Sequence, residues 1–217
     1  TPDSTDVGIA DGTDSANNLA NFGNAVAAQT LTVVGSEGTE KVDVQADASA
    51  AGIANAVNDV SGSTGVEAQA KTTATISGLS ENGTVSFELL GANTTPVAVS
   101  STVTTGDLSS LVEVINEQTG QTGIQAALGG SGGSLELTLD SGENIVIGNF
   151  SHSAASSPSS TGAGNAVTLA VTGASGSQST TLSDGGTTDG LHGSTVVGGE
   201  VTFTSAGPFN VTSDAAN

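Results

Sequence analysis

Hydrophobic residues recur along the chain with two different periods, and each period predicts a local structure. Residues 31–34 and 41–44 are two short alternating runs separated by Gly-Ser-Glu-Gly, which indicates a β-hairpin. Ile53, Val57 and Val60 then lie three or four residues apart, a spacing typical of one face of an amphipathic helix. Alternation returns over 66–76 and predicts a strand. The predicted order is therefore β-β-α-β.

The same order of patterns occurs a second time. The dipeptide Asn82-Gly83 is a frequent two-residue turn, and residues 84–90 alternate after it. A stripe of apolar residues at helical spacing follows, made of Leu108, Leu111, Val112 and Ile115. Further strands are predicted at 124–128, 135–139 and 145–147.

Polar residues and glycines predict where the two helices begin and end. Asp47 is expected to cap the N-terminus of the first helix, and Gly62 to end it in a left-handed conformation. In the second unit Thr105 is the expected cap, Asp107 favours the positive end of the helix, and Gly120 ends it.

The two units are also related in sequence. Residues 47–68 align with 105–126 at a constant offset of 58 residues. Five pairs are identical: Asn58/Asn116, Gly62/Gly120, Thr64/Thr122, Gly65/Gly123 and Ala68/Ala126. Upstream, Leu31-Thr-Val-Val-Gly35 aligns with Phe87-Glu-Leu-Leu-Gly91 at an offset of 56. So many identities at one offset indicate an internal duplication.

After Phe150 the composition changes. Residues 151–164 are rich in Ser and Gly and are expected to form a linker. Short strands are then predicted at 167–172, 179–182, 195–197, 200–204 and 209–212. The tetrapeptide Gly-Asn-Ala-Val occurs at 23–26 and again at 164–167, on either side of the two units. The two units are therefore expected to be inserted into a β-rich domain made from both ends of the chain.

These patterns predict an α+β, mainly β fold that contains two β-β-α-β repeat units, an all-β domain and few short helices. The predicted parts are a discontinuous β-rich domain at 1–28 with 160–217, a first repeat at 29–80, a second repeat at 81–150 and a linker at 151–164.

Charge and composition narrow the classes of function. Of 217 residues, only Lys41 and Lys71 are basic, against 22 acidic residues, and the net charge is −20. Two basic side chains cannot neutralise a run of phosphates. Binding to nucleic acid or to an anionic membrane is therefore not expected. The chain has no Cys, which excludes disulfides and thiolate catalysis. It also has no Met, which predicts a processed product or an excised fragment of a longer protein.

The side chains that could carry chemistry are few. His152 and His192 both lie in Ser/Gly-rich stretches and are expected to be exposed loop residues rather than general bases. Asp3, Asp6, Asp11 and Asp14 form the densest cluster of carboxylates. Their spacing matches neither an EF-hand nor a glycine-rich calcium repeat, which favours a solubilising role, with weak surface calcium binding as the alternative. No catalytic, cofactor-binding or metal-binding residue is predicted, and the chain is not expected to be an enzyme.

Residues 31–70, LTVVGSEGTEKVDVQADASAAGIANAVNDVSGSTGVEAQA, resemble a motif in the variable middle region of bacterial flagellins and hook-associated proteins. Residues 87–126 resemble a second, more divergent copy, and 195–203 with 209–213 resemble the β-rich end of that region. The terminal coiled-coil helices of flagellins are absent from this sequence.

The resemblance implies a structural protein outside the cell, namely the surface-exposed outer domains of a flagellar filament subunit. It further implies an antigenic surface on a motility filament, self-association with neighbouring subunits mainly through the absent core, and Ser/Thr hydroxyls available for O-glycans. The alternative is a repeat module of a secreted bacterial adhesin that binds a glycan or a protein ligand.

Overall fold

The structure is a computed structural model that describes residues 5–6, 9–11, 23–155, 165–174, 178–184 and 193–215. Within these ranges the strands form three antiparallel sheets, and the helices are short. The predicted α+β, mainly β class is therefore confirmed. No helix in the described part of the chain is long and apolar enough to cross a membrane.

Three strands from the two ends of the described chain form the smallest sheet, in the order β15-β3-β4. These are β15 (Asn210–Ser213), β3 (Gln29–Val34) and β4 (Thr39–Val44). The helices α1 (Ala50–Asp59) and α2 (Ser61–Thr64) follow β4 in the chain. The hairpin at 31–44 and the helix were both predicted from the hydrophobic periods.

The largest sheet has seven strands. Its main path is β1 (Thr5–Asp6), β14 (Glu200–Ser205), β5 (Val66–Ser77), β11 (Val167–Gly173) and β12 (Ser179–Asp184). Off this path, β9 (Ser134–Leu139) pairs with β5 and with β8 (Gln125–Leu128).

The third sheet has five strands and packs against the largest sheet across a cluster of buried hydrophobic side chains, called the second core below. Its order is β2 (Ile9–Asp11), β13 (Thr195–Val197), β10 (Ile145–His152), β6 (Gly83–Leu90) and β7 (Val97–Val103). The helices α3 (Ser109–Glu117) and α4 (Thr119–Thr122) lie between β7 and β8 in the chain.

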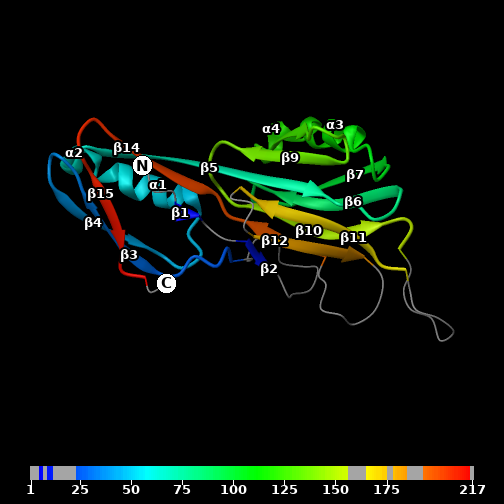
Figure 1. Cartoon of the computed structure of the whole chain (residues 1–217), viewed down its shortest axis with the longest axis horizontal. Helices are drawn as coiled ribbons and strands as arrows, with labels where there is room; N and C mark the ends of the chain where they lie inside the picture. Colours follow the sequence, from blue (N-terminus) through cyan, green and yellow to red (C-terminus); the bar gives the residue numbers. More distant parts are fainter. Residues whose placement is uncertain are drawn as a thin grey trace.

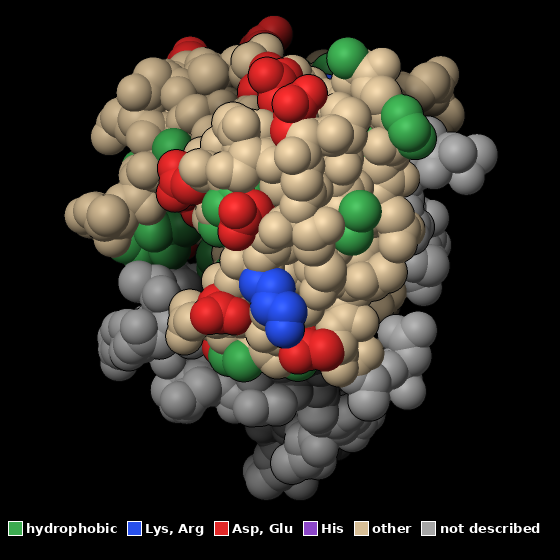
Figure 2. Space-filling model, turned by 90° about the vertical axis from the view of Figure 1, so that its left-hand side faces the viewer, with side chains coloured by type: hydrophobic (Ala, Val, Ile, Leu, Met, Phe, Trp, Pro, Cys, Tyr) green, Lys and Arg blue, Asp and Glu red, His purple; other side chains and the backbone are tan. Residues whose placement is uncertain are grey.

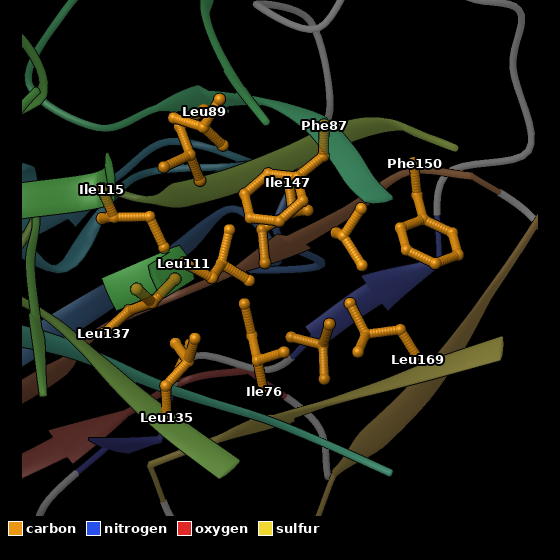
Figure 3. Close-up of a cluster of buried hydrophobic side chains, with 14 of the residues drawn as sticks. Ile76, Phe87, Leu89, Leu111, Ile115, Leu135, Leu137, Ile147, Phe150 and Leu169 are labelled. Atoms are coloured by element: carbon orange, nitrogen blue, oxygen red, sulfur yellow. The ribbon is translucent and has the colours of Figure 1, made fainter. Parts of the chain in front are cut away.

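The molecule is elongated and has two halves (Figure 1). The first half contains β1, β3, β4, α1, α2, β14 and β15, and its core includes Val33, Val57 and Phe203. The second half contains α3, α4, β6–β13 and β2. Its core draws Leu111 and Ile115 from α3, and strands of both larger sheets supply the other side chains labelled in Figure 3.

Strand β5 belongs to both halves. Its residues Val66–Lys71 pair with β14, whereas Thr72–Ser77 pair with β9. Strand β11 pairs with the end of β5 as well, at Ala74–Ser77. A single continuous strand thus passes from one core into the other.

The C-terminal strands are distributed over all three sheets. Strands β11, β12 and β14 join the largest sheet, β13 joins the five-stranded sheet and β15 joins β3. The division into separate domains at 1–28 with 160–217, 29–80 and 81–150 stays a prediction.

The boundary of the predicted linker needs a correction. Strand β10 does not end near Phe150 but continues to His152, because Ser151 and His152 pair with Ser86 and Val85 of β6. The first two residues of the predicted linker 151–164 are therefore strand, and residues 156–164 lie outside the described residues.

Candidate functional site

The prediction that His152 is an exposed loop residue is wrong. Its exposed fraction is 5%, because β10 carries it to the end of the second core. Its backbone N–H donates to Asp184 Oδ2 at 2.6 Å, and its Nδ1 accepts from the N–H of Ala154 at 3.1 Å. Among the described residues, its Nε2 has no hydrogen-bond partner. The imidazole is therefore part of the packing and is not presented to solvent.

The other predicted candidates are not brought together by the described residues. His192, Asp3 and Asp14 lie outside them. Asp6 is in β1 of the largest sheet, whereas Asp11 is in β2 of the five-stranded sheet. In the described part of the chain, no three His, Asp or Glu side chains are grouped as metal ligands would be.

The feature that the structure does build twice is a helix–turn–strand segment, at residues 50–68 and 108–126. In the first segment α1 is followed by α2, then Gly65, then β5. In the second, α3 is followed by α4, then Gly123, then β8. The two short helices, Ser61–Thr64 and Thr119–Thr122, match at the offset of 58 residues seen in the sequence.

An asparagine amide closes the edge of the strand in each segment. Asn58 Oδ1 accepts from the N–H of Ala68 at 2.8 Å, and Asn58 Nδ2 donates to the carbonyl of Ala68 at 2.9 Å. Asn116 makes the same two bonds to Ala126, at 2.8 and 2.9 Å. The side-chain amide thus takes the place of a neighbouring strand at one residue of the edge.

A threonine hydroxyl supports the turn between helix and strand. Thr64 Oγ1 donates to the carbonyl of Val60 at 3.1 Å and accepts from the N–H of Val66 at 3.2 Å. Thr122 makes the corresponding bonds to Gln118 and Ile124 at the same distances. Both threonines are fully buried, so these bonds satisfy groups that water cannot reach.

The left-handed residue of each segment is not the glycine predicted from the sequence. Gly65 and Gly123 have φ of +71° and +73°, a conformation that strongly favours glycine. Gly62 and Gly120 lie within α2 and α4, because the chain makes one more short helical turn before it reverses. The predictions for Gly62 and Gly120 are therefore wrong by three residues each.

A third glycine pair lies in the turn that follows the first strand of each unit. A Cβ atom on Gly35 would stand 1.9 Å from the carbonyl oxygen of Thr64. A Cβ atom on Gly91 would stand 2.5 Å from that of Thr122. Glycine is required at both positions because the turn packs directly on the helix–strand backbone. The sequence alignment pairs Gly35 with Gly91, but it does not reveal this contact.

The predicted helix caps are also corrected. Ser49, not Asp47, caps α1, since its Oγ accepts from the N–H of Gly52 at 3.1 Å. Asp47 has a φ of +60° and uses its backbone N–H to bond Val26. The carboxylate of Asp47 therefore lies outside the helix, in the turn that precedes it.

The second helix has no side-chain cap in the usual position. The N-cap residue of α3 is Leu108, and the N–H of Thr105 donates instead to Asn82 Oδ1 at 2.8 Å. Asp107 Oδ1 accepts from the N–H of Ser109 at 2.9 Å. The hydrogen bonds from the Ser109 backbone and hydroxyl lower the pKa of the Asp107 carboxyl below its ordinary value.

A groove of about 520 Å³ runs beside the first segment, between α1 and β5. Lys71 lines it and lies 3.7 Å from Asp140, but both side chains are more than half exposed. Such an ion pair contributes little free energy. Apart from Lys71 and Asp140, the residues that line the groove include no acid or base.

Comparison with protein families connects this arrangement to a known motif. Residues 30–80 match the family model of the flagellin hook IN motif. The motif contains β3, β4 and the first helix–turn–strand segment, with Gly35, Asn58 and Gly65 at the positions described above. The match relates this segment of the chain to flagellins.

Other comparisons add less. No curated protein matches the chain. Two similar solved structures are the D1-D2-D3 and the D2-D3 domains of the flagellar cap protein FliD from Escherichia coli, at 13% and 15% identity. Each match covers 65% of this chain, and the chain spans 54% of the first structure and 95% of the second. Both have a TM-score of 0.23, so the hook IN motif, and not these structures, relates the chain to flagellar proteins.

Proposed function

We propose that the chain forms the outer, surface-exposed part of a flagellar filament subunit and that its role is structural. The hook IN motif at residues 30–80 carries this proposal. Its repeated residues make backbone bonds, close a strand edge or fit a tight turn, so the motif builds a rigid fold rather than a reactive centre.

The second helix–turn–strand segment supports the proposal. Its residues Asn116, Thr122 and Gly123 repeat the bonds and the backbone conformation of the first segment. We therefore interpret residues 81–150 as a second, diverged copy of the motif. Duplication of a structural unit extends a surface without any new chemistry.

The positions of the first and last described strands also support an outer region. Strand β1 pairs with β14, and β15 pairs with β3, so both strands belong to the first half (Figure 1). A region inserted into a filament subunit must leave the filament core and return to it on one side. In this proposal the first half faces the core of the filament and the second half projects outward from the filament.

The proposal includes neighbouring subunits as partners and O-glycans on exposed Ser and Thr side chains. It includes no enzymatic activity, nucleic acid or membrane. The place of action is the surface of the filament.

Immunogold electron microscopy of the bacterium that encodes the chain tests the proposal. An antibody raised against the purified chain is expected to label the flagellar filament along its whole length. Label confined to the filament tip would indicate a cap protein, and label confined to the hook a hook-associated one. Label on the cell envelope that persists after the flagella are sheared off would contradict a flagellar role and favour an adhesin.

A further inference from the structure

Strand β5 changes its partner where the two halves meet. Lys71 is the last residue that pairs with β14, and Thr72 is the first that pairs with β9. The link between β13 and β14 crosses at the same place, since a Cβ atom on Gly199 would stand 2.7 Å from the carbonyl oxygen of Lys71. The two crossings therefore lie side by side. They keep the halves together, but rotation of one half about the line of β5 must be restrained by other contacts.

A turn of the second half makes such a contact. Residues 140–144 join β9 to β10, and the carbonyl of Gly142 accepts from the N–H of Ala51 in α1 at 2.9 Å. The first N–H groups of a helix have no partner within the helix. Ala51 is buried, so the turn supplies a partner that water cannot. The second half thus provides a bond that the start of α1 requires.

Two buried polar side chains hold the same turn. Thr72 Oγ1 donates to the carbonyl of Glu143 at 2.7 Å. Asn24 Nδ2 donates to Asn144 Oδ1 at 3.0 Å and to the carbonyl of Ala48, just ahead of α1, at 2.8 Å. Thr72 and Asn24 both have an exposed fraction of 0%. Moving the turn away would leave these buried groups without partners, which is costly.

The backbone of the turn also fits closely against β5. Gly142 is buried and has a φ of +74°, and a Cβ atom on it would stand 2.2 Å from the Cβ atom of Ala70. A larger residue at this position must push the turn away from β5. Farther along the helix, the groove described above is lined by Asn55 of α1 and by Ser141 of the turn. The helix and the turn therefore part after the first turn of α1.

We infer that residues 140–144 form a latch that fixes the second half in one orientation about β5. The closed latch is bonded to α1, Thr72 and Asn24 at the same time. Opening it frees the rotation of the second half and leaves the N–H of Ala51 without its partner. The start of α1 and the orientation of the second half are thereby coupled. This inference is independent of the proposed place in the filament.

The distance between two spin labels tests the orientation. The chain has no cysteine, so Thr39→Cys in β4 and Ala98→Cys in β7 place one label in each half at exposed positions. Figure 2 shows the end of the first half where β4 lies, and in Figure 1 this end is remote from the second half. A label there does not touch the latch. Double electron–electron resonance of the labelled chain should give one narrow distribution of distances.

Two substitutions in this labelled chain should open the latch to different degrees. Gly142→Ala should broaden the distribution of distances, because the added Cβ atom displaces the turn. Hydrogen exchange at the N–H of Ala51, measured by NMR, should become at least about tenfold faster, as expected when a buried bond is lost. Thr72→Val removes only a hydroxyl and should cause smaller changes in the same direction.

Each substitution has a matched control within the second half. Gly132→Ala adds a methyl group at another left-handed glycine, with a φ of +78°, where its Cβ atom would stand 2.9 Å from the carbonyl oxygen of Gly106. Thr122→Val removes a hydroxyl that is as buried as that of Thr72 but bonds only Gln118 and Ile124. Both controls should lower the stability of the second half without broadening the distances or speeding exchange at position 51.

Three results would overturn the inference. The first is a narrow distribution of distances in Gly142→Ala, and the second is equal broadening in the two controls. The third is broadening without faster exchange at Ala51, because the latch would then not couple the two halves. Circular dichroism establishes that each variant folds, and Thr72→Val decides the matter if Gly142→Ala does not fold.

Discussion

The two helix–turn–strand segments contain the same hydrogen bonds, but different parts of the chain enclose them. In the first segment α1 and β5 pack with Val201 and Phe203 of β14, which lies far along the sequence. In the second, α3 and β8 join a larger core that includes β9, β10 and β11. The comparison teaches that hydrogen bonds between residues close in the sequence determine the geometry of the segment. Strands far along the sequence determine how deeply the segment is buried.

The alanines that the two asparagine side chains bond also differ in burial. Ala68 is buried, with an exposed fraction of 5%, whereas Ala126 is half-buried. The same asparagine amide therefore shields backbone groups from water in the first segment and shares them with water in the second. Identical residues should then differ in their contribution to the free energy of unfolding.

The largest expected effect comes from removing a core side chain at a paired position. Ile53→Ala and Leu111→Ala should each lower the free energy of unfolding by about 2–5 kcal/mol, because both side chains are buried. Hydrogen exchange should increase mainly in the half that contains the substitution. Equal increases in β6, β7 and α3 after Ile53→Ala would contradict the predicted boundary between 29–80 and 81–150. Asn55→Ala, at an exposed position of α1, is the control.

Alanine at the paired turn glycines should give the next largest effect. Gly35→Ala is expected to cost about 3 kcal/mol and Gly91→Ala less, because the added Cβ meets a carbonyl oxygen at 1.9 Å and 2.5 Å respectively. Chemical denaturation measures both. Gly62→Ala has the opposite expected sign, since no atom beyond its chain neighbours and its own helix backbone lies within 4 Å of its Cβ position and alanine favours a helix. An equal loss of unfolding free energy in all three variants would show that the contact between the added Cβ and the carbonyl oxygen is not the cause.

Removal of the edge-capping amides directly tests the difference in burial. Asn58→Ala should cost about 1–3 kcal/mol, because it leaves the N–H and carbonyl of buried Ala68 without partners. Asn116→Ala should cost less, since water can replace the amide at Ala126. Thermal unfolding of the two variants gives the comparison. A greater loss for Asn116→Ala would show that burial does not decide the contribution.

The smallest expected effect distinguishes the two helix starts by pH. The pKa of Asp107 is lowered in the fold, so its bond to the N–H of Ser109 stabilises α3 above the ordinary carboxyl pKa. This stabilisation should disappear as the pH falls through the lowered pKa. The Ser49 cap of α1 has no titrating group and should persist. Amide chemical shifts of Ser109 and Gly52, followed by NMR during acid titration, report the two ends separately. A Ser109 shift that does not titrate would contradict the bond.

Hydrophobic periodicity predicted the helices and strands well because each of them must place apolar residues on its buried face at a fixed spacing. The stripe at Ile53 and Val57, and the alternation before and after it, correspond to α1, β3, β4 and β5. The ends of the helices were predicted less well. Asp47 and Ser49 both have side chains that can cap a helix, and Gly62 and Gly65 can both adopt the left-handed conformation that ends one. Only the tertiary path of the chain selects among them.

Sequence patterns did not predict which strands pair when they lie far apart in the sequence. His152 lies in a Ser/Gly-rich stretch and was expected in solvent, but pairing with Val85 across 67 residues buries it. The edge-capping role of Asn58 and Asn116 was not predicted either, although the two residues are identical at the offset of 58 residues. A repeated polar residue on an exposed helix face, followed ten residues later by a repeated alanine, is the signal that could have indicated it.

The continuity of β5 has a mechanical consequence. Twelve residues of one strand serve both cores, with β14 paired to its beginning and β9 to its end. Bending one half against the other would have to bend this strand and stretch its ladders at the same time. The molecule should therefore resist bending as one body, and a force applied to one half should be transmitted to the other through β5.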